Sequence, residues 1–135
     1  MDSKKEKLLE ESYEQIINVG FCIIPYEDLS DIIAPNPMVF GTNKDEKIFS
    51  FEGIEALFKS QFEQMGNMKP GLDRNRIATR ISTDGNSAFI VEEITLSISS
   101  TEKVNTIFMR VSCLMEYIDS RWKLTHWHTS TPVET

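Results

Sequence analysis

The chain has 135 residues, of which 40% are hydrophobic and 26% are charged, and its formal net charge is −7. This size and composition predict one globular domain, covering residues 1–135. The acidic balance and the lack of a Lys/Arg block argue against a nucleic-acid-binding surface. No apolar run approaches the ~18 residues of a membrane span, and the first seven residues lack the apolar core of a signal peptide. We therefore expect a cytoplasmic protein without nucleic-acid or membrane partners.

Helical periodicity dominates the first third of the chain. Ser3 and Glu6 form a capping-box pattern and Gly20 is a natural stop, so residues 4–19 are predicted to form an amphipathic helix. A short second helix is predicted at 26–34, where a proline precedes the segment and another proline ends it.

A brief strand and the clearest helix come next. The strand is predicted at 38–41 and a polar loop at 42–47. Ser50 can cap a third helix at 51–65, which Gly66 closes. The apolar stripe of this helix consists of Ile54, Leu57, Phe58, Phe62 and Met65.

From Asp73 onward the hydrophobic period changes from helical to two. Strands are predicted at 74–82, 87–98, 104–118 and 122–132, with tight turns at Asp84-Gly85 and near Asp119-Ser120. Helices segregated from an antiparallel meander indicate an α+β domain. Long antiparallel strands twist and curl, and a curled sheet closed by helices leaves a pocket at its mouth.

Two local patterns carry a resemblance to a known family. The first is Phe40-Gly41-Thr42, then Glu46, then Gly53-Ile54-Glu55-Ala56-Leu57. The second is Arg110-Val111-Ser112, followed by Trp122-Lys123-Leu124-Thr125-His126-Trp127-His128-Thr129-Ser130-Thr131-Pro132. Together with the element order, they resemble the SnoaL-like branch of the nuclear transport factor 2 (NTF2)-like superfamily. The second pattern is also similar to the association domain of calcium/calmodulin-dependent protein kinase II.

The resemblance implies an α+β cone, with three N-terminal helices packed in a strongly curved antiparallel sheet, an internal pocket, and homodimers formed through the sheet. It transfers function less well, because one scaffold hosts isomerases, cyclases, dehydratases, hydrolases and non-catalytic hubs. Residues 38–43 contain no carboxylate, whereas the ketosteroid isomerase branch usually has its general base in that region. Steroid isomerisation is therefore not expected.

Glu92 and Arg110 are the charged residues that most need an explanation. By strand parity Glu92 shares a face with five apolar residues, so we expect it inside the cone. If Ile98 pairs with Val104, then Glu92 lies opposite Arg110. A buried charge is costly unless it is paired. The pair is interpreted either as a structural salt bridge or as the polar floor of a ligand pocket.

The last turn decides which face of the final strand meets that pair. A two-residue turn places Arg110 on the face of Trp127 and leaves His126 and His128 outside. A three-residue turn places Arg110 opposite His128 instead. In that register His128 could act as a general acid or base beside Glu92 and Arg110. The sequence does not decide between the two.

Neither a metal nor a cofactor is expected. His126 and His128 share a strand face, but spacing places no third ligand beside them, and Glu116 is the nearest guess. Cys22 and Cys113 have neither a metal spacing nor a disulfide framework and lie in apolar surroundings.

Three further arginines alternate along the strand predicted at 74–82. Arg74, Arg76 and Arg80 are expected on a solvated or interface face, opposite Glu93 across the hairpin. An anion site is the less favoured interpretation.

These patterns support three hypotheses of function. The leading one is a small-molecule-binding domain. The alternatives are an isomerase, dehydratase or hydrolase that uses His128 with Glu92 or Arg110, and a non-catalytic homo-oligomerisation module. The ligand is expected to be mainly apolar with one or two polar groups, such as a carboxylate or carbonyl met by Arg110. The expected lining is Tyr13, Phe58, Phe62, Ile90, Ile94, Phe108 and Leu114, with Trp127 in one register or His126 and His128 in the other.

Overall fold

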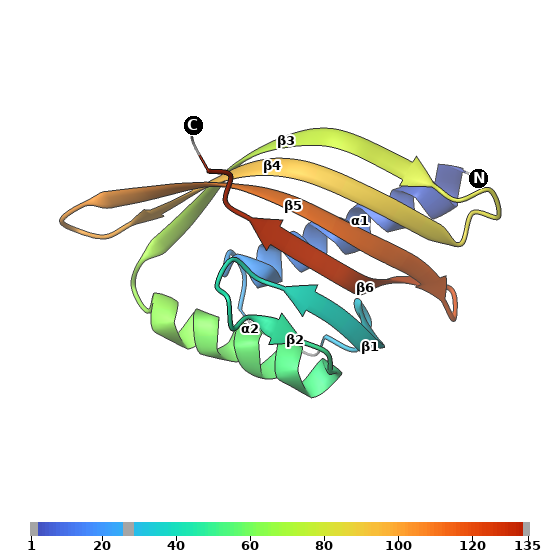
Figure 1. Ribbon diagram of the computed structural model, residues 1–135, viewed down its shortest axis with the longest axis horizontal. Coiled ribbons are helices and arrows are strands. Elements are labelled where there is room, and N and C mark those ends of the chain that lie inside the picture. Colours follow the sequence, from blue (N-terminus) through green and yellow to red (C-terminus); the bar gives the residue numbers. More distant parts are fainter. Residues whose placement is uncertain (1–2, 26–28, 134–135) are drawn as a thin grey trace.

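A computed structural model describes residues 3–25 and 29–133 of the chain, which form two helices and six strands (Figure 1). In chain order they are α1 (Ser3–Gly20), β1 (Ile33–Phe40), β2 (Lys47–Ile48), α2 (Phe51–Met65), β3 (Lys69–Ile81), β4 (Ser87–Ser99), β5 (Val104–Ile118) and β6 (Arg121–Ser130). The predicted α+β class is confirmed. Neither of the two described helices is long and apolar enough to cross a membrane.

All six strands belong to one sheet with the order β2-β1-β6-β5-β4-β3. Strands β3, β4 and β5 are long and bent, and α1 lies across one face of the sheet (Figure 1). Strand β1 runs parallel to β6, whereas every other neighbouring pair is antiparallel. The prediction of a purely antiparallel sheet is therefore wrong at this one junction.

The helix predicted at 26–34 is also wrong, as far as the structure describes it. Residues 26–28 lie outside the described residues, Leu29 begins a turn, and Ile33 already starts β1. Pro35 and Pro37 lie inside β1, where the register with β6 shifts and partner β2 is absent, so their missing N–H groups break no ladder. Pro35, which was expected to end the helix, thus lies within an irregular strand.

The core lies between α1 and the concave face of the sheet. Leu9, Ile16 and Ile17 of α1 are buried against inward-facing residues of β4, β5 and β6. Trp122 is fully buried, and its indole N–H donates to the carbonyl of Lys5 at 3.0 Å, which fixes the first turn of α1 to β6.

Helix α2 begins as the sequence predicts. The Ser50 hydroxyl accepts a hydrogen bond from the Gly53 amide at 3.0 Å, and Gly66 ends the helix with a φ of +55°. Gly53 is required because a Cβ there would come within 2.7 Å of the Ile48 side chain. Of the predicted stripe, Ile54 is fully buried and Phe58 packs against the core.

Strand parity along β4 is confirmed. Its inward face carries Ala88, Ile90, Ile94 and Leu96, with Glu92 buried among them at 2% exposure. The pairing with β5 is displaced by one residue from the one considered above, because Ser99 pairs with Val104. Each residue of β4 therefore pairs with the β5 residue next to the one expected from the sequence.

The last hairpin combines two features that sequence patterning treats separately. Asp119 and Ser120 form a two-residue turn with φ values of +51° and +64°, and Ile118 pairs with Arg121. A β-bulge at Thr125 then shifts the register between Leu114 and Met115. The Thr125 hydroxyl donates to the Leu114 carbonyl at 3.1 Å.

Candidate ligand pocket

A cavity of about 380 Å³ lies between the end of α1, helix α2 and the concave face of the sheet. This volume falls within the range of roughly 300–1,000 Å³ typical of small-molecule sites. Its lining is Ile16, Gly20, Phe21, Cys22, Val39, Gly41, Thr42, Glu46, Leu57, Phe58, Gln61, Gln64, Met65, Met68, Leu96, Ile98, Ile107, Met109, Leu124, Trp127 and Thr129.

Aromatic and aliphatic groups form most of the wall. Trp127 points into the cavity from β6, because the bulge at Thr125 brings it to the inner face. Phe21 lies 6.2 Å from Trp127, centroid to centroid, and Phe58 comes from α2 on the other side. Met65 and Met109 add flexible side chains that can adapt to different ligand shapes.

A small number of polar groups interrupt this wall. Gln61 and Gln64 come from α2, and Thr129 lies on β6, where its hydroxyl accepts a hydrogen bond from the Trp127 indole N–H. Thr42 and Glu46 come from the loop that joins β1 to β2. The cavity therefore offers hydrogen-bonding groups mainly on its α2 and loop sides.

Glu46 is held close to the cavity by its contact with Gly41. The Gly41 amide donates to the Glu46 carbonyl at 2.9 Å, and the Glu46 carboxylate lies over the glycine. A Cβ on Gly41 would come within 1.8 Å of a Glu46 carboxylate oxygen. The Gly-Thr and acidic residues of the first sequence pattern thus serve one local structure.

Both cysteines are buried, free thiols. Cys22 borders the cavity with a left-handed φ of +63°, and burial raises its pKa. Burial raises the pKa of Cys113 to about 12. Neither thiol is therefore activated as a nucleophile at neutral pH.

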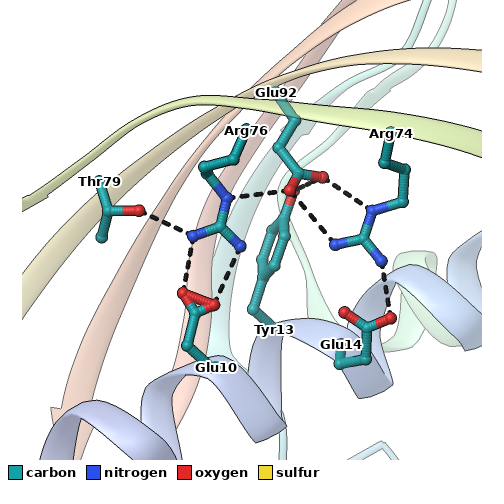
Figure 2. A network of polar contacts seen from close by, with 7 residues as sticks. All are labelled: Glu10, Tyr13, Glu14, Arg74, Arg76, Thr79 and Glu92. Atoms are coloured by element: carbon teal, nitrogen blue, oxygen red, sulfur yellow. Dashed lines mark hydrogen bonds and ion pairs between the residues drawn. The ribbon is translucent and has the colours of Figure 1, made fainter.

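A second set of polar groups lies beside the middle of α1 (Figure 2). We call it the Glu92 cluster and define it as Glu10, Tyr13, Glu14, Arg74, Arg76, Thr79 and Glu92. The buried Glu92 carboxylate accepts from Arg74 Nε at 3.0 Å, from Arg76 Nε at 2.9 Å and from the Tyr13 hydroxyl at 3.0 Å. It is therefore fully hydrogen-bonded.

Both arginines of the cluster also bind helix α1. Arg74 donates to Glu14 at 2.7 Å and Arg76 to Glu10 at 2.6 Å. Both arginines also lie near the Tyr13 ring, at 5.7 and 5.0 Å from its centroid. The cluster thus joins α1 to the edge strand β3 and to the inner face of β4.

The pKa values reflect this arrangement. Burial alone would raise the pKa of Glu92, but hydrogen bonds from Arg74 and Arg76 outweigh burial and hold it below its ordinary value. Burial, with the negative charge of Glu92, raises the pKa of Tyr13. At neutral pH Glu92 is a carboxylate and Tyr13 a phenol that donates to it.

Arg110 does not pair with Glu92, so the buried Glu92–Arg110 pair predicted from the sequence is wrong. It lies opposite Glu93 on the outer face, and its Nε donates to that carboxylate at 3.3 Å. The side chain of Arg110 is 60% exposed. The real partners of Glu92 are Arg74 and Arg76, and the expectation that these two face solvent is wrong. Only Arg80 does so, because a bulge after Arg76 reverses the parity of β3.

His126 and His128 also point away from the cavity. With Phe40 they border a shallow cleft on the outer side, together with loop residues 41–44, 46 and 47. His126 Nδ1 lies 2.9 Å from the Met38 carbonyl, and His128 pairs across the sheet with Ser112. No group of three or more potential metal ligands occurs within the described residues, and Glu116 pairs with Lys123 farther along β5.

The other candidate lining residues divide between three places. Phe58 and Trp127 line the cavity. Tyr13, Ile90 and Ile94 are buried in the core and do not line the cavity. Phe62, Phe108 and Leu114 are not part of its lining, and the first two are 37% and 43% exposed.

Sequence patterning missed three contributors to this interior. Arg74 and Arg76 have the same parity as the inward residues of β4, but their charge argued for an outward position. Glu46 was visible only as part of the Gly-Thr pattern. The cavity side of β5, including Met109, was missed because the register was displaced by one residue.

Comparisons with known proteins agree with this architecture. The family model for the SnoaL-like domain matches residues 23–134. Nothing among the curated proteins matches the chain. A ketosteroid isomerase-like protein from Erwinia carotovora atroseptica is 12% identical, with 98% of this chain and 100% of that one covered and a TM-score of 0.71.

Two further solved structures show the same fold. A dehydratase candidate of the NTF2-like family from Streptomyces avermitilis has a TM-score of 0.77 at 8% identity, covering 98% of this chain and 100% of the other. A candidate calcium/calmodulin-dependent protein kinase II association domain from Xanthomonas campestris has a TM-score of 0.67 at 21% identity, covering 100% and 91%. At these identities the likeness concerns the fold, which is an NTF2-like α+β fold with a curved mixed sheet.

Proposed function

The chain belongs to the SnoaL-like family, and from that premise and the shape of its interior we propose that it binds a small, mainly apolar molecule in the cavity between α1, α2 and the sheet. The observation that carries the proposal is the cavity itself, which has about 380 Å³ of space, an aromatic and aliphatic wall, and a few polar groups on one side.

The wall supports an apolar ligand body for a physical reason. Transfer of apolar surface from water into such a wall is favourable by roughly 25 cal/mol per Å². Phe58 and Trp127 add flat ring faces against which a cyclic ligand can pack. The polar groups can then fix the orientation of the ligand.

Catalysis by His128 with Glu92 or Arg110 has no support in this geometry. Glu92 is saturated by four hydrogen bonds from three residues inside the molecule, whereas Arg110 and His128 lie on the outer face of the sheet. General acid–base chemistry needs groups within hydrogen-bonding reach of one substrate. These three residues do not share such a space.

Two neighbouring positions of β5 offer a matched test of the cavity. Met109 lines it and Phe108 points outward, so Met109→Trp fills the space while Phe108→Trp leaves it open. We expect 1-naphthalenemethanol to bind wild type and Phe108→Trp alike by isothermal titration calorimetry. Met109→Trp should lose about tenfold or more in affinity, which is roughly 1.4 kcal/mol. Equal binding by the two variants would contradict the proposal.

We also propose that two copies associate through the outer face of the sheet. Phe89 and Leu114 are cross-strand partners on that face, and Phe89 is 42% exposed. Burial of such a patch favours association. Light scattering should give twice the monomer mass for wild type and the monomer mass for Phe89→Arg. A wild-type monomer at micromolar concentration would refute this assembly.

A further inference from the structure

We propose that the cavity selects against acids and takes an apolar molecule that bears an amine or a hydroxyl group, with the Glu46 carboxylate meeting that group. This inference rests on the proposed function, since it names the chemical class of ligand for the same cavity. The amine form of such a ligand would carry a positive charge at neutral pH.

The charges around the cavity point to this class. Among the described residues that line the cavity, Glu46 has the only side chain with a formal charge. The same set contains no lysine, arginine or histidine. The other polar groups are neutral amides and hydroxyls from Thr42, Gln61, Gln64 and Thr129. A ligand carboxylate would therefore enter a partly dry space that offers neutral hydrogen bonds, no cation and one repelling carboxylate.

Glu46 is free to accept a ligand donor. Within the described chain its carboxylate makes no hydrogen bond or ion pair, although the residue is half-buried. Gly41 leaves room for this carboxylate beside the cavity, as the absence of a Cβ there allows. A half-buried carboxylate without a partner gains a charge-assisted hydrogen bond when an ammonium or hydroxyl group arrives.

The neighbouring cations are directed elsewhere. Lys44 lies in the same loop as Glu46, and Lys47 begins β2. Neither lysine lines the cavity; both border the outer cleft with His126 and His128, and Glu46 lies between this cleft and the cavity and borders both. Arg74 and Arg76 are held by Glu92 and by the glutamates of α1. Arg110, the expected partner of a ligand carboxylate, is on the other face of the sheet. Instead of a ligand carboxylate bound by Arg110, we therefore expect a ligand amine or hydroxyl group bound by Glu46.

Three compounds with one ring system separate charge from shape. At pH 7, 1-naphthylmethylamine is a cation, 1-naphthalenemethanol is neutral and 1-naphthoic acid is an anion. Isothermal titration calorimetry should show the amine binding about tenfold tighter than the acid or better, as expected for one attractive and one repulsive charge at a partly exposed site. The alcohol should lie between them.

A matched pair of variants assigns the preference to one carboxylate. Glu46→Gln should reduce the preference of the amine over the acid to about threefold or less. It should weaken binding of the alcohol less than binding of the amine, because the glutamine amide oxygen can still accept a hydrogen bond from the hydroxyl group. Asp45→Asn removes the same charge from the adjacent, exposed residue that does not line the cavity, and should retain the preference. This control separates a contact with Glu46 from the general attraction of an acidic protein for cations.

The outcomes distinguish this inference from the function on which it rests. If the acid binds as tightly as the amine, or if Glu46→Gln keeps the full preference, the inference is overturned while binding in the cavity stands. If Met109→Trp and Phe108→Trp bind the alcohol equally, or if none of the three compounds binds, the proposed function fails and takes the inference with it.

Discussion

The two ends of the space beneath the sheet are built in opposite ways. Beside the middle of α1, the Glu92 cluster fills the interior, and its buried carboxylate accepts hydrogen bonds from two arginines and a tyrosine. Toward the end of α1, an apolar cavity is left open and borders Glu46, whose carboxylate has no partner among the described side chains.

This difference separates stability from recognition. A saturated cluster of charges has nothing left to offer a ligand, and losing one member leaves the others buried without partners. In the apolar cavity, by contrast, no described side chain packs against the wall and the Glu46 carboxylate has no partner among the described residues, so both are available to a ligand. Changes in the cluster should therefore alter folding, and changes in the cavity should alter binding.

The largest effect is expected at Glu92. Replacing it with alanine leaves the Tyr13 hydroxyl buried without an acceptor and both arginines short of a carboxylate, so we expect a loss of about 3 kcal/mol in the free energy of unfolding. Urea denaturation measures this. Glu93→Ala is the matched control, because the adjacent carboxylate pairs with exposed Arg110 and should cost less than about 1 kcal/mol. Equal losses would mean that the two faces of β4 do not differ.

Acid should weaken the same cluster. The pKa of Glu92 is lowered in the folded state, so the unfolded chain binds its proton more readily. The stability contributed by Glu92 is therefore present above the ordinary value of 4.5 and is lost as pH falls through the lower folded pKa. Urea midpoints from pH 6 to pH 3 should fall more steeply for wild type than for Glu92→Gln. Parallel curves would contradict a lowered pKa.

A smaller effect is expected from one arginine of the cluster. Arg76→Ala removes bonds to Glu92, Glu10 and Thr79, but the arginine is partly exposed and Arg74 still neutralises Glu92. A loss of roughly 1–2 kcal/mol is expected. Arg80→Ala, on the outward part of the same strand, should stay within about 0.5 kcal/mol of wild type. Differential scanning calorimetry of both variants would contradict the assignment if Arg80 proved the costlier loss.

The smallest effect is expected at Arg110. Its pair with Glu93 is exposed and has an N···O distance of 3.3 Å, so Arg110→Ala should cost less than about 1 kcal/mol. A Tm close to that of wild type is the expected result. A loss as large as that of Glu92→Ala would mean that Arg110 supports the interior after all.

The fold was predictable from the sequence where an element is specified by local periodicity, capping or turn residues. The helix at 51–65, the parity of β4 and the hairpin at Asp84-Gly85 all follow from periodicity and capping. The helix prediction was wrong at residues 29–34 because Pro35, interpreted as the end of a helix, lies instead inside the irregular strand β1. The parallel pairing of β1 with β6 depends on contacts distant in sequence, which local patterns do not contain.

The positions of the site residues depend on register shifts and β-bulges of one residue, which hydrophobic periodicity does not reveal. One residue of register between β4 and β5 moved Arg110 from Glu92 to Glu93. One extra residue at Thr125 turned Trp127 inward and His128 outward, although the turn itself has two residues. A similar bulge after Arg76 separated Arg76 from Arg80. A shift of one residue moves every later side chain of the strand to the opposite face. Residues that share a face could therefore be predicted along a regular strand, but their pairing partners on the neighbouring strand could not.

The most direct test of the contrast between the two ends is a crystal structure of the protein with 1-naphthylmethylamine bound. The rings should lie between Phe58 and Trp127, with the amine within hydrogen-bonding distance of the Glu46 carboxylate and the contacts of Glu92 with Arg74 and Arg76 unchanged. Rings seated in the outer cleft beside His126 and His128, or a ligand that displaces Glu92 from its arginines, would contradict the account.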